Sequence, residues 1–358
     1  MAIRQIHIQG YRSIRDLKLG LSQVNVVLGP NGCGKTNLYR ALHLLHVAAE
    51  GELAQTLSRE GGLPSVVWAG PRSRGPSRLQ IGVELDEFGF ELEIKPFGRG
   101  ESDPFFLDPD IKSEVVSVLE RGKQVALLER KGGSAFARDS KGERVTFPFE
   151  LWGNESVLSQ LVEPHRFPIP SMVRGQLLGW RFYHSFRTDP DAPARLPHVG
   201  VRTPVLSHTG FDLAAALKTI QHIGNHQALD EGVQRAFPGA VLDVRDDAGR
   251  FSVALQLPGV LRPLEGAELS DGTIRYLCQL AALLSPRPAP FLALNEPETS
   301  LHPDLLPALA ALVVEAGKHS QVLVTTHSGL LASEIQALCD AEPVQLERVN
   351  GATTVQTG

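Results

Sequence analysis

A short apolar strand, a glycine-rich loop and a helix follow one another directly in residues 24–46, and few folds accommodate that succession. Residues 24–28 are a β-branched run typical of a buried parallel strand. Residues 29–36 read Gly-Pro-Asn-Gly-Cys-Gly-Lys-Thr and fit the phosphate-loop pattern G-x-x-x-x-G-K-S/T. Leucine and alanine then recur at helical spacing as far as Leu45. The succession predicts an α/β fold that binds a nucleoside triphosphate.

The residue types of this loop suit phosphate binding. Gly29, Gly32 and Gly34 let consecutive backbone N–H groups turn toward phosphate oxygens, where a Cβ atom would obstruct them. The helix N-terminus adds a partial positive charge to this cradle. We expect the Lys35 amine to reach the β- and γ-phosphates and the Thr36 hydroxyl to ligate Mg²⁺. The predicted cofactors are therefore ATP and Mg²⁺, and the predicted nucleotide-binding residues of the loop are Gly29, Pro30, Asn31, Gly32, Cys33, Gly34, Lys35, Thr36 and Asn37.

The composition is that of a folded protein with a packed core. Of 358 residues, 42% are hydrophobic, which is ample for one large α/β domain or for a domain with an insertion. The charged fraction of 21% argues against wholesale disorder. The net charge of −5 gives the chain no general attraction to nucleic acid or to anionic lipid.

Cysteine usage and the N-terminal sequence indicate a cytoplasmic protein. The three cysteines show no paired metal-ligand spacing, and one of them lies in the phosphate loop, which fits a reducing compartment without structural disulfides. They are Cys33, Cys278 and Cys339. The N-terminus has no signal-peptide layout, and no apolar run is long enough to cross a bilayer. We therefore expect a cytoplasmic location and no membrane partner.

The segment before the loop contains two short strands joined by a polar step. Residues 3–8 alternate apolar and polar side chains, and residues 17–19 form a second strand-like run. Between them lies Gly10-Tyr11-Arg12-Ser13-Ile14, in which an aromatic and a basic residue precede a serine and an apolar residue. Together with the sequence around the loop, this opening resembles the ATPase heads of SMC and RecF proteins, which belong to the wider ABC-type class.

The resemblance implies an α/β P-loop NTPase of the ABC/SMC/RecF head type. Such a head has a mostly parallel sheet around the phosphate loop, a small antiparallel sheet and a helical lobe that carries a signature motif. Residues 79–85 and 90–94 fit the antiparallel sheet, because a turn at residues 86–89 joins them into a predicted hairpin. We expect residues 1–358 to form a single head.

Residues 100–205 are the least informative part of the chain, and we interpret them as an insertion within the head. Residues 124–128 and 144–147 are strand-like and predict a further hairpin around Gly132. No sustained heptad pattern occurs, so the long coiled coil of a complete SMC protein is not expected. The sequence therefore predicts the head alone.

Residues 269–273, which read Leu-Ser-Asp-Gly-Thr, precede an apolar helix predicted for residues 274–284. A serine at the start of a helix is, by itself, explained equally well as a simple N-cap. The position of this motif, after the phosphate loop and before an acidic motif, gives it weight, and it resembles the ABC signature of RecF-like ATPases. The resemblance implies that Ser270 and Gly272 contact the γ-phosphate of ATP held by a second head.

Residues 291–303 begin with a run typical of an apolar strand. Acidic residues follow this run, and Ser-Leu-His-Pro ends the segment. They resemble the Walker B strand and D-loop of RecF-like ATPases, which implies that Glu296 orients or deprotonates the attacking water. A further buried strand, residues 321–326, ends at His327, which resembles the switch histidine that stabilises the γ-phosphate. A lone histidine at a strand end is more often structural, so this interpretation depends on the position of His327 alone.

One residue departs from the family pattern. The position before the catalytic glutamate is usually an aspartate, and here it is Asn295. An aspartate would hold Mg²⁺ through a water molecule and add negative charge, whereas an asparagine keeps only a carbonyl acceptor. We therefore expect Thr36 and Asn295 at the metal, weaker retention of Mg²⁺, and slow hydrolysis in preference to none.

The resemblance implies a slow Mg²⁺-dependent ATPase that works as a head-to-tail homodimer with ATP sandwiched between the heads. It also implies a DNA-associated process: repair, genome maintenance or anti-phage defence. The alternative is a nucleotide-gated switch that controls a separate effector protein with little turnover. The ATPase of a membrane transporter is disfavoured, because no transporter coupling segment is evident. The expected partners are a second copy of the chain and either DNA or an effector protein.

Overall fold

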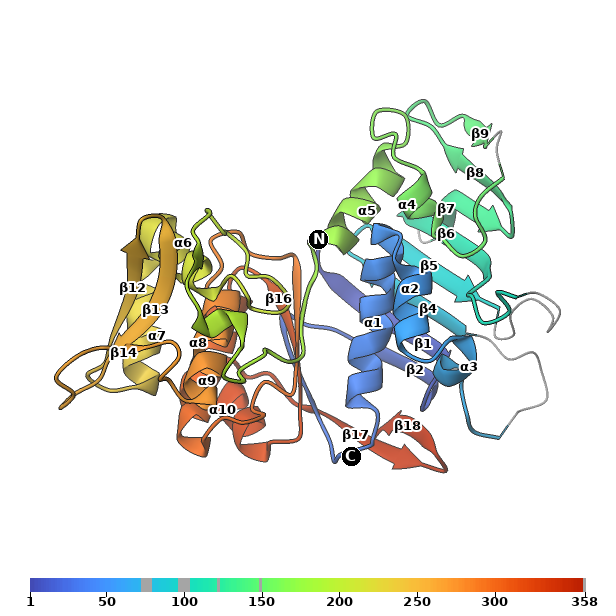
Figure 1. The fold of residues 1–358 in the computed structure, drawn as a ribbon. Helices are drawn as coiled ribbons and strands as arrows, with labels where there is room; N and C mark the ends of the chain where they lie inside the picture. Colours follow the sequence, from blue (N-terminus) through green and yellow to red (C-terminus); the bar gives the residue numbers. More distant parts are fainter. Residues whose placement is uncertain (72–78, 96–103, 121–122, 148–149, 357–358) are drawn as a thin grey trace. The chain divides into compact units, whose positions relative to one another are not determined.

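The computed structural model describes residues 1–71, 79–95, 104–120, 123–147 and 150–356, which belong to two compact units (Figure 1). The first unit comprises Met1–Ser22, Gly29–Trp180 and Gln345–Gly358. The second unit comprises Gln23–Leu28 and Arg181–Val344. The strand that leads into the phosphate loop therefore belongs to the second unit, whereas the loop and its helix belong to the first.

The first unit is built on an eight-stranded antiparallel sheet with the strand order β2-β1-β4-β5-β6-β7-β8-β9. Along β5 every second residue from Phe88 to Ile94 is buried, as expected for a sheet with one covered face. The strands are β1 (Ile3–Tyr11), β2 (Ile14–Gly20), β4 (Leu79–Leu85), β5 (Phe88–Ile94), β6 (Ile111–Glu120), β7 (Lys123–Lys131), β8 (Ser134–Arg138) and β9 (Arg144–Thr146).

Helices pack against this sheet, and the longest of them is the helix that follows the phosphate loop (Figure 1). It contacts β1 and β4 as well as three other helices, which explains why apolar residues surround most of it. The helices are α1 (Lys35–Glu50), α2 (Leu53–Arg59), α3 (Leu63–Val66), α4 (Val157–Gln160) and α5 (Pro168–Gly179). A hairpin of β17 (Val344–Val349) and β18 (Ala352–Val355) completes the unit, with β18 against β2.

The antiparallel sheet confirms one predicted hairpin and corrects two other predictions. β4 and β5 pair antiparallel, as predicted for residues 79–85 and 90–94. The predicted small size of the sheet is wrong, because β6 to β9 extend it through the segment that gave little sequence signal. The hairpin predicted between residues 124–128 and 144–147 is also wrong, because β8 lies between β7 and β9 and pairs with both. A tight turn at Gly132, where φ is +58°, allows β8 to begin so early.

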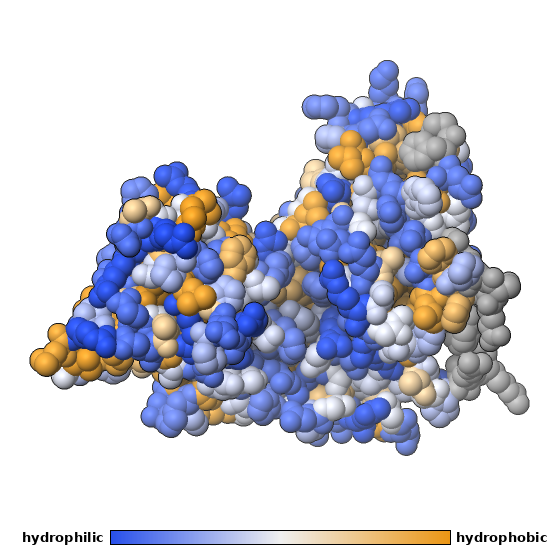
Figure 2. Space-filling model, viewed as in Figure 1, coloured by the Kyte–Doolittle hydropathy of each residue, from blue (hydrophilic) through white to orange (hydrophobic). Residues whose placement is uncertain are grey.

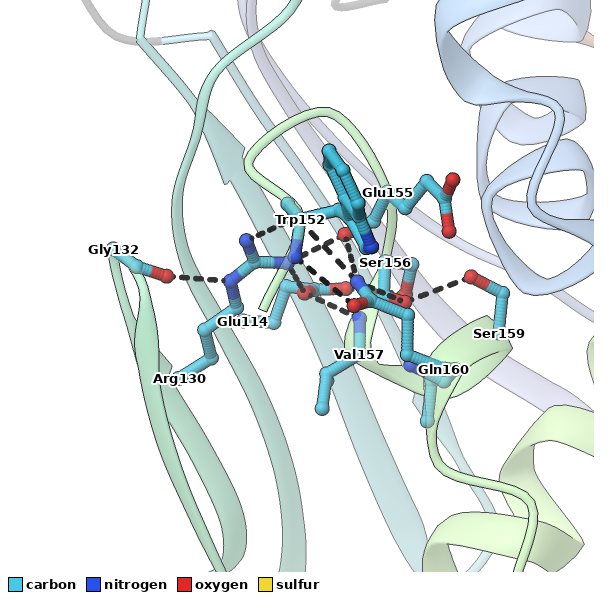
Figure 3. Close-up of polar contacts among 10 residues, drawn as sticks. Glu114, Arg130, Gly132, Trp152, Glu155, Ser156, Val157, Ser159 and Gln160 are labelled. Carbon is cyan, nitrogen blue, oxygen red and sulfur yellow. Dashed lines mark hydrogen bonds and ion pairs between the residues drawn. The ribbon is translucent and has the colours of Figure 1, made fainter. Parts of the chain in front are cut away.

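A buried ion pair joins the neighbouring strands β6 and β7 of this sheet (Figure 3). Arg130 Nη1 and Glu114 Oε2 are 3.1 Å apart, and both side chains are completely buried. The Glu114 carboxylate also accepts hydrogen bonds from the Ser156 hydroxyl and, at 2.8 Å, from the Val157 N–H. Burial raises the pKa of the Glu114 carboxyl, and these hydrogen bonds and the charge of Arg130 act in the opposite direction.

The guanidinium of this pair also holds the loop that follows the sheet. Arg130 donates to the carbonyl oxygens of Gly132 at 2.7 Å, Trp152 at 2.8 Å and Glu155 at 2.5 Å (Figure 3). The planar fork of arginine suits several acceptors at fixed angles, which a lysine amine would not satisfy equally well. The ion pair therefore joins strands β6 and β7 to the segment that leads into α4.

We expect Glu114→Ala to lower the free energy of unfolding of the first unit by about 3 kcal/mol, because it leaves the Arg130 charge buried without its counter-ion. Chemical denaturation followed by circular dichroism would measure the change. Glu163→Ala, which removes a half-exposed partner of Arg166, is the matched control and should change stability by less than about 0.5 kcal/mol. Equal losses for the two variants would contradict the role of the buried pair.

The second unit contains a parallel sheet with the strand order β10-β15-β16-β3. Its two central strands are buried along their whole length, which explains their continuous apolar sequences. The strands are β10 (Arg181–Tyr183), β15 (Phe291–Asn295), β16 (Gln321–Thr326) and β3 (Val24–Leu28). The strands predicted for residues 24–28, 291–295 and 321–326 are thus confirmed.

Helices and a second, smaller sheet complete this unit (Figure 1). The helix predicted for residues 274–284 is confirmed as α8, which begins at Asp271, within the signature motif. The helices are α6 (Leu213–Ile223), α7 (His226–Ala236), α8 (Asp271–Leu283), α9 (Leu306–Gly317) and α10 (Gly329–Cys339), with short 3-10 turns η1 (Pro193–Arg195) and η2 (Pro303–Leu305). The small antiparallel sheet consists of β11 (His198–Val199), β12 (Val241–Asp247), β13 (Arg250–Gln256) and β14 (Leu264–Glu265).

Hydrophilic residues cover most of the face of each unit that is seen in Figure 2, and apolar residues occur there in separate small groups. Scattered exposed apolar side chains of this kind are ordinary on globular proteins. Within the described part of the chain, none of the helices combines the length and the apolar character needed to cross a membrane.

Candidate nucleotide site

The phosphate loop of the first unit has a backbone that requires glycine. Gly32 has a φ of +81° and Gly34 a φ of +113°, in the region that other residues rarely adopt. A Cβ atom at Gly34 would lie 2.0 Å from Thr353 Oγ1, and one at Gly29 would lie 2.5 Å from the Leu346 carbonyl oxygen. The loop is therefore enclosed at Gly29 and Gly34, whereas Pro30, Asn31 and Gly32 between them are exposed, and α1 begins at Lys35.

Lys35 lies inside the loop that it is predicted to serve. The residue is only 3% exposed, and its amine donates to the carbonyl oxygens of Gly29 at 2.7 Å and Pro30 at 3.1 Å. These carbonyls keep the amine against the loop, where a phosphate oxygen is expected to bind. An anionic phosphate oxygen is a stronger acceptor than a neutral carbonyl, so we expect the amine to turn toward bound nucleotide.

Two hydroxyl groups hold the loop from segments distant in sequence. Ser13 Oγ lies 2.7 Å from Thr353 Oγ1 and accepts a 2.7 Å hydrogen bond from Asn37 Nδ2. Thr353 Oγ1 donates to the carbonyl oxygen of Cys33 at 2.8 Å. Ser13 belongs to the aromatic–basic–serine step that precedes the loop in the sequence, so these contacts explain why that step accompanies the loop.

Strands of the second unit end side by side at the carboxyl edge of the parallel sheet. Asn295 of β15 stands opposite Thr325 of β16, and Thr326 stands opposite Leu28 of β3. Gly29 follows Leu28 in the chain, so the phosphate loop starts from this same edge. Open α/β sheets bind their ligands at the carboxyl ends of their strands.

Glu296, the predicted catalytic base, follows β15 at this edge and is half-buried. Its φ of +50° is uncommon for a residue other than glycine, and such strain is often found at functional sites. Its N–H donates to the carbonyl oxygen of Thr325 at 2.7 Å, and its own carbonyl accepts from the N–H of Thr299 at 3.1 Å. The backbone of Glu296 is thus held from both sides in a sharp turn.

Asn295 is fully enclosed and engages both ends of its amide. Only 1% of the residue is exposed. Its Nδ2 lies 2.7 Å from His184 Nδ1, directly after β10, and its Oδ1 accepts a 2.8 Å hydrogen bond from the Thr325 hydroxyl. The amide can donate to His184 Nδ1, whereas an aspartate at this position would accept from the other tautomer of that histidine.

His327 is oriented by a carboxylate that the sequence motif contains but to which we assigned no role. Glu298 is 7% exposed, and its Oε1 lies 3.1 Å from His327 Nδ1. The same oxygen accepts from the His327 N–H at 3.0 Å and from the Thr326 hydroxyl at 2.5 Å. A carboxylate at Nδ1 favours the tautomer with its proton on that nitrogen, which leaves Nε2 for a ligand. The imidazole itself is 44% exposed.

The signature motif caps the N-terminus of α8. Ser270 is exposed, and its Oγ accepts a 3.2 Å hydrogen bond from the Thr273 N–H. A Cβ atom at Gly272 would lie 3.1 Å from the carbonyl oxygen of Ser300. The structure therefore brings the signature and the Ser-Leu-His-Pro segment together within the second unit.

The predicted site residues divide between the two units. Residues 29–37 belong to the first unit. The second unit holds Ser270, Gly272, Asn295, Glu296 and His327. Among the residues that the structure describes, no group of three or more histidine, cysteine and acidic side chains could hold a metal ion. Magnesium in nucleotide sites takes few protein ligands and completes its shell with phosphate oxygens, so Thr36 and Asn295 stay predicted ligands of that ion.

Comparison with known proteins identifies both a family and a fold. A family model described as "AAA domain, putative AbiEii toxin, Type IV TA system" matches residues 24–333. A search of curated proteins finds no match. An SMC head bound to the C-winged helix domain of ScpA matches with a TM-score of 0.58 and 15% identity, covering 99% of this chain and 98% of that chain.

A second solved structure gives the same result. It is an SMC head domain with an extended coiled coil, bound to the C-terminal domain of ScpA derived from Pyrococcus furiosus. It matches with a TM-score of 0.52 and 13% identity, covering 99% of this chain and 96% of that chain. At such identities the likeness shows the fold, and it confirms the predicted α/β fold class of the SMC head type.

Proposed function

The chain belongs to the AAA_21 family of AAA domains, and from that membership we propose that it binds ATP with Mg²⁺ and hydrolyses it slowly as an ATP-sandwiched, head-to-tail homodimer. The observation that carries the proposal is the shared carboxyl edge of β15, β16 and β3. Glu296 and His327 follow two of these strands, and the phosphate loop follows the third. A base, a phosphate-stabilising group and a phosphate loop therefore leave one edge of one sheet.

Residues 29–37 bind the triphosphate in this proposal. Their backbone N–H groups and the N-terminus of α1 face the phosphate oxygens, and the Lys35 amine binds the β- and γ-phosphates. Thr36 and Asn295 would hold Mg²⁺, which supplies positive charge that offsets the charge of the phosphates. The Ser13 and Thr353 hydroxyls keep the loop in shape before nucleotide arrives, so little ordering is required on binding.

Hydrolysis requires a base for water and a donor for the γ-phosphate. Glu296 accepts a proton from the water whose oxygen attacks the γ-phosphorus, while the bond to the β–γ bridging oxygen breaks and ADP leaves. His327 stabilises the γ-phosphate through Nε2 when the ring is doubly protonated, because both ring nitrogens then donate, and Glu298 at Nδ1 keeps the ring in the required orientation. In this proposal Glu296 is the general base, and His327 stabilises the negative charge of the γ-phosphate.

The second half of each site comes from another copy of the chain. Ser270 is exposed at the N-terminus of the thirteen-residue helix α8, where a helix end and a hydroxyl can meet an anion. Gly272 lets a backbone approach closely at the same point. In a head-to-tail pair these groups contact the γ-phosphate bound by the other head, so ATP joins the two copies.

The resemblance to SMC and RecF heads implies DNA-associated work for such a dimer, in repair, genome maintenance or anti-phage defence. The alternative is a nucleotide-gated switch that controls a separate effector protein. Two observations favour the alternative: Asn295 in place of a carboxylate, and the family description, which reads "AAA domain, putative AbiEii toxin, Type IV TA system". Phosphate release measured with and without duplex DNA separates them. DNA-stimulated turnover supports the first function, and tight ATP binding with no stimulated turnover supports the second.

We expect Asn295→Asp to tighten Mg²⁺ binding and to raise the turnover number modestly, by up to about tenfold, because the added charge acts on the metal through a water molecule. Turnover measured across a Mg²⁺ titration tests this expectation. Thr325→Val removes the hydroxyl partner of Asn295 without adding charge and is the matched control; it should not raise turnover. A lower rate for Asn295→Asp at every Mg²⁺ concentration would show that Asn295 does not occupy the Walker B position.

A further inference from the structure

Arg195 is a buried arginine next to the signature motif, far from it in sequence. It ends the short turn η1, and its side chain is only 4% exposed. Its nearest carboxylate belongs to Asp271, the residue between Ser270 and Gly272 of the signature. Burying a guanidinium costs free energy unless its donors make hydrogen bonds. The hydrogen-bond partners of Arg195 therefore indicate which segments it stabilises.

Three hydrogen bonds of Arg195 go to residues 266–271, which lead into and begin α8. Nη1 donates to the carbonyl oxygens of Gly266 at 2.9 Å and Leu269 at 2.5 Å. Nη2 donates to Asp271 Oδ1 at 2.5 Å. Nε donates to the carbonyl oxygen of Thr188 at 2.9 Å, within the segment that leads into η1. One rigid planar group therefore holds three points along residues 266–271 and fixes them to a neighbouring segment.

The backbones of the two segments, at Gly266 and at Arg195, also lie close together. A Cβ atom at Gly266 would lie 2.8 Å from the carbonyl oxygen of Arg195, so the two segments meet without a side chain between them. Ser270 itself is exposed, and its hydroxyl bonds only within the first turn of α8 in the contacts seen here. The inner side of the signature loop is thus held by Arg195, while its outer side stays accessible.

We propose that Arg195 is a positioning residue for the signature motif, which sets Ser270 and Gly272 in the geometry that receives the γ-phosphate of a second copy. This role rests on the proposed function, because it requires the signature to act in a head-to-tail dimer. Arg195 does not touch nucleotide; it acts through the Leu269 carbonyl and the Asp271 carboxylate. Its loss should leave ATP binding by the phosphate loop intact, since that loop belongs to the first unit.

Nucleotide affinity and turnover should therefore respond differently to Arg195→Ala. We expect ATP affinity to stay within about twofold of wild type and turnover to fall by about a hundredfold, because small displacements of positioned groups have effects of that size. Arg195→Lys should not restore turnover, since one amine cannot satisfy all the acceptors. Equal losses in affinity and turnover, or full turnover, would overturn the assignment.

Asp271 gives a second test in case Arg195→Ala does not fold. Its side chain is 62% exposed, so substitution there should not disturb folding. Asp271→Ala removes the acceptor for Nη2 and should lower turnover by about tenfold, whereas Asp271→Asn keeps an acceptor oxygen and should restore most of it. Identical activity of Asp271→Ala and Asp271→Asn would count against positioning by Arg195.

Mixing two inactive chains tests whether the defect lies in the signature. An Arg195→Ala chain has an intact phosphate loop, and a Lys35→Ala chain has an intact signature. In a mixed head-to-tail dimer one of the two sites is complete, so an equimolar mixture should recover about a quarter of wild-type turnover. A chain carrying both substitutions, mixed with Lys35→Ala, should recover none.

A Ser270→Arg chain mixed with Lys35→Ala separates failure of the positioning role from failure of the dimer mechanism. If this mixture recovers activity and the Arg195→Ala mixture does not, Arg195 does not serve the signature, although the dimer mechanism stands. If neither mixture recovers activity, the signature does not act in trans, and both the proposed function and the role of Arg195 are wrong.

Discussion

Lys35→Ala is expected to weaken ATP binding roughly a thousandfold, equivalent to about 4 kcal/mol. The amine is buried in the phosphate loop and bonded to the carbonyl oxygens of Gly29 and Pro30, which keeps it beside the phosphate position. Alanine removes the only side-chain cation of the loop and with it the charge-assisted hydrogen bonds expected to the β- and γ-phosphates, each of which contributes about 1.5–3 kcal/mol. Titration calorimetry with ATP and Mg²⁺ measures the loss.

Lys112→Ala is the matched control for this result. Lys112 also belongs to the first unit, but its side chain is half-exposed and pairs with Glu93 on the surface. Its removal should leave ATP affinity unchanged, because exposed ion pairs contribute little. Equal affinities of Lys35→Ala and wild type would refute the assignment of residues 29–37 to nucleotide binding.

Glu296→Gln is expected to lower turnover by about a thousandfold while ATP affinity stays close to wild type. Glutamine keeps the size and the hydrogen-bonding backbone of Glu296, including the bond to Thr325, but it cannot accept a proton from water. Single-turnover phosphate release measures the chemical step separately from product release. Glu231→Gln, at a half-exposed position of α7, should have full activity. Normal turnover of Glu296→Gln would mean that another group is the base.

The site was predictable where residues that act together are consecutive in the chain. The phosphate loop, the signature at the start of α8 and the acidic turn after β15 each lie within a few residues, and strand or helix neighbours place them. The parallel strands were predictable for the same reason, because burial on both faces gives an unbroken apolar run. Position along the chain was enough to identify each of these elements.

The contacts that hold the site were not predictable, because their partners are distant in sequence. Ser13 and Thr353 are separated by 340 residues and His184 and Asn295 by 111. Arg195 and Asp271 are 76 residues apart. Nothing local marks His184 or Arg195 as a partner of a motif, and the step that contains Ser13 gives no sign of its contact with Thr353. Glu298 is different, since it stands inside the acidic motif, and its neighbour His327 could have suggested an imidazole–carboxylate pair.

The extent of the antiparallel sheet was missed for a related physical reason. β6 to β9 pair with one another and with β5, and their pairing depends on cross-strand packing that no single segment displays. Part of what fixes this region is the fully buried pair Glu114 and Arg130. Charged residues in a sequence usually predict exposed positions. A buried ion pair therefore interrupts the alternation of apolar and polar residues from which strands are inferred.

Light scattering of the Glu296→Gln chain with ATP and Mg²⁺ tests the central claim, that ATP joins two heads through the signature of one and the phosphate loop of the other. Because this variant retains ATP without hydrolysing it, the dimer should accumulate. We predict twice the monomer mass with ATP, the monomer mass with ADP, and the monomer mass with ATP when Ser270→Arg is added. A monomer under all three conditions would contradict the composite-site mechanism.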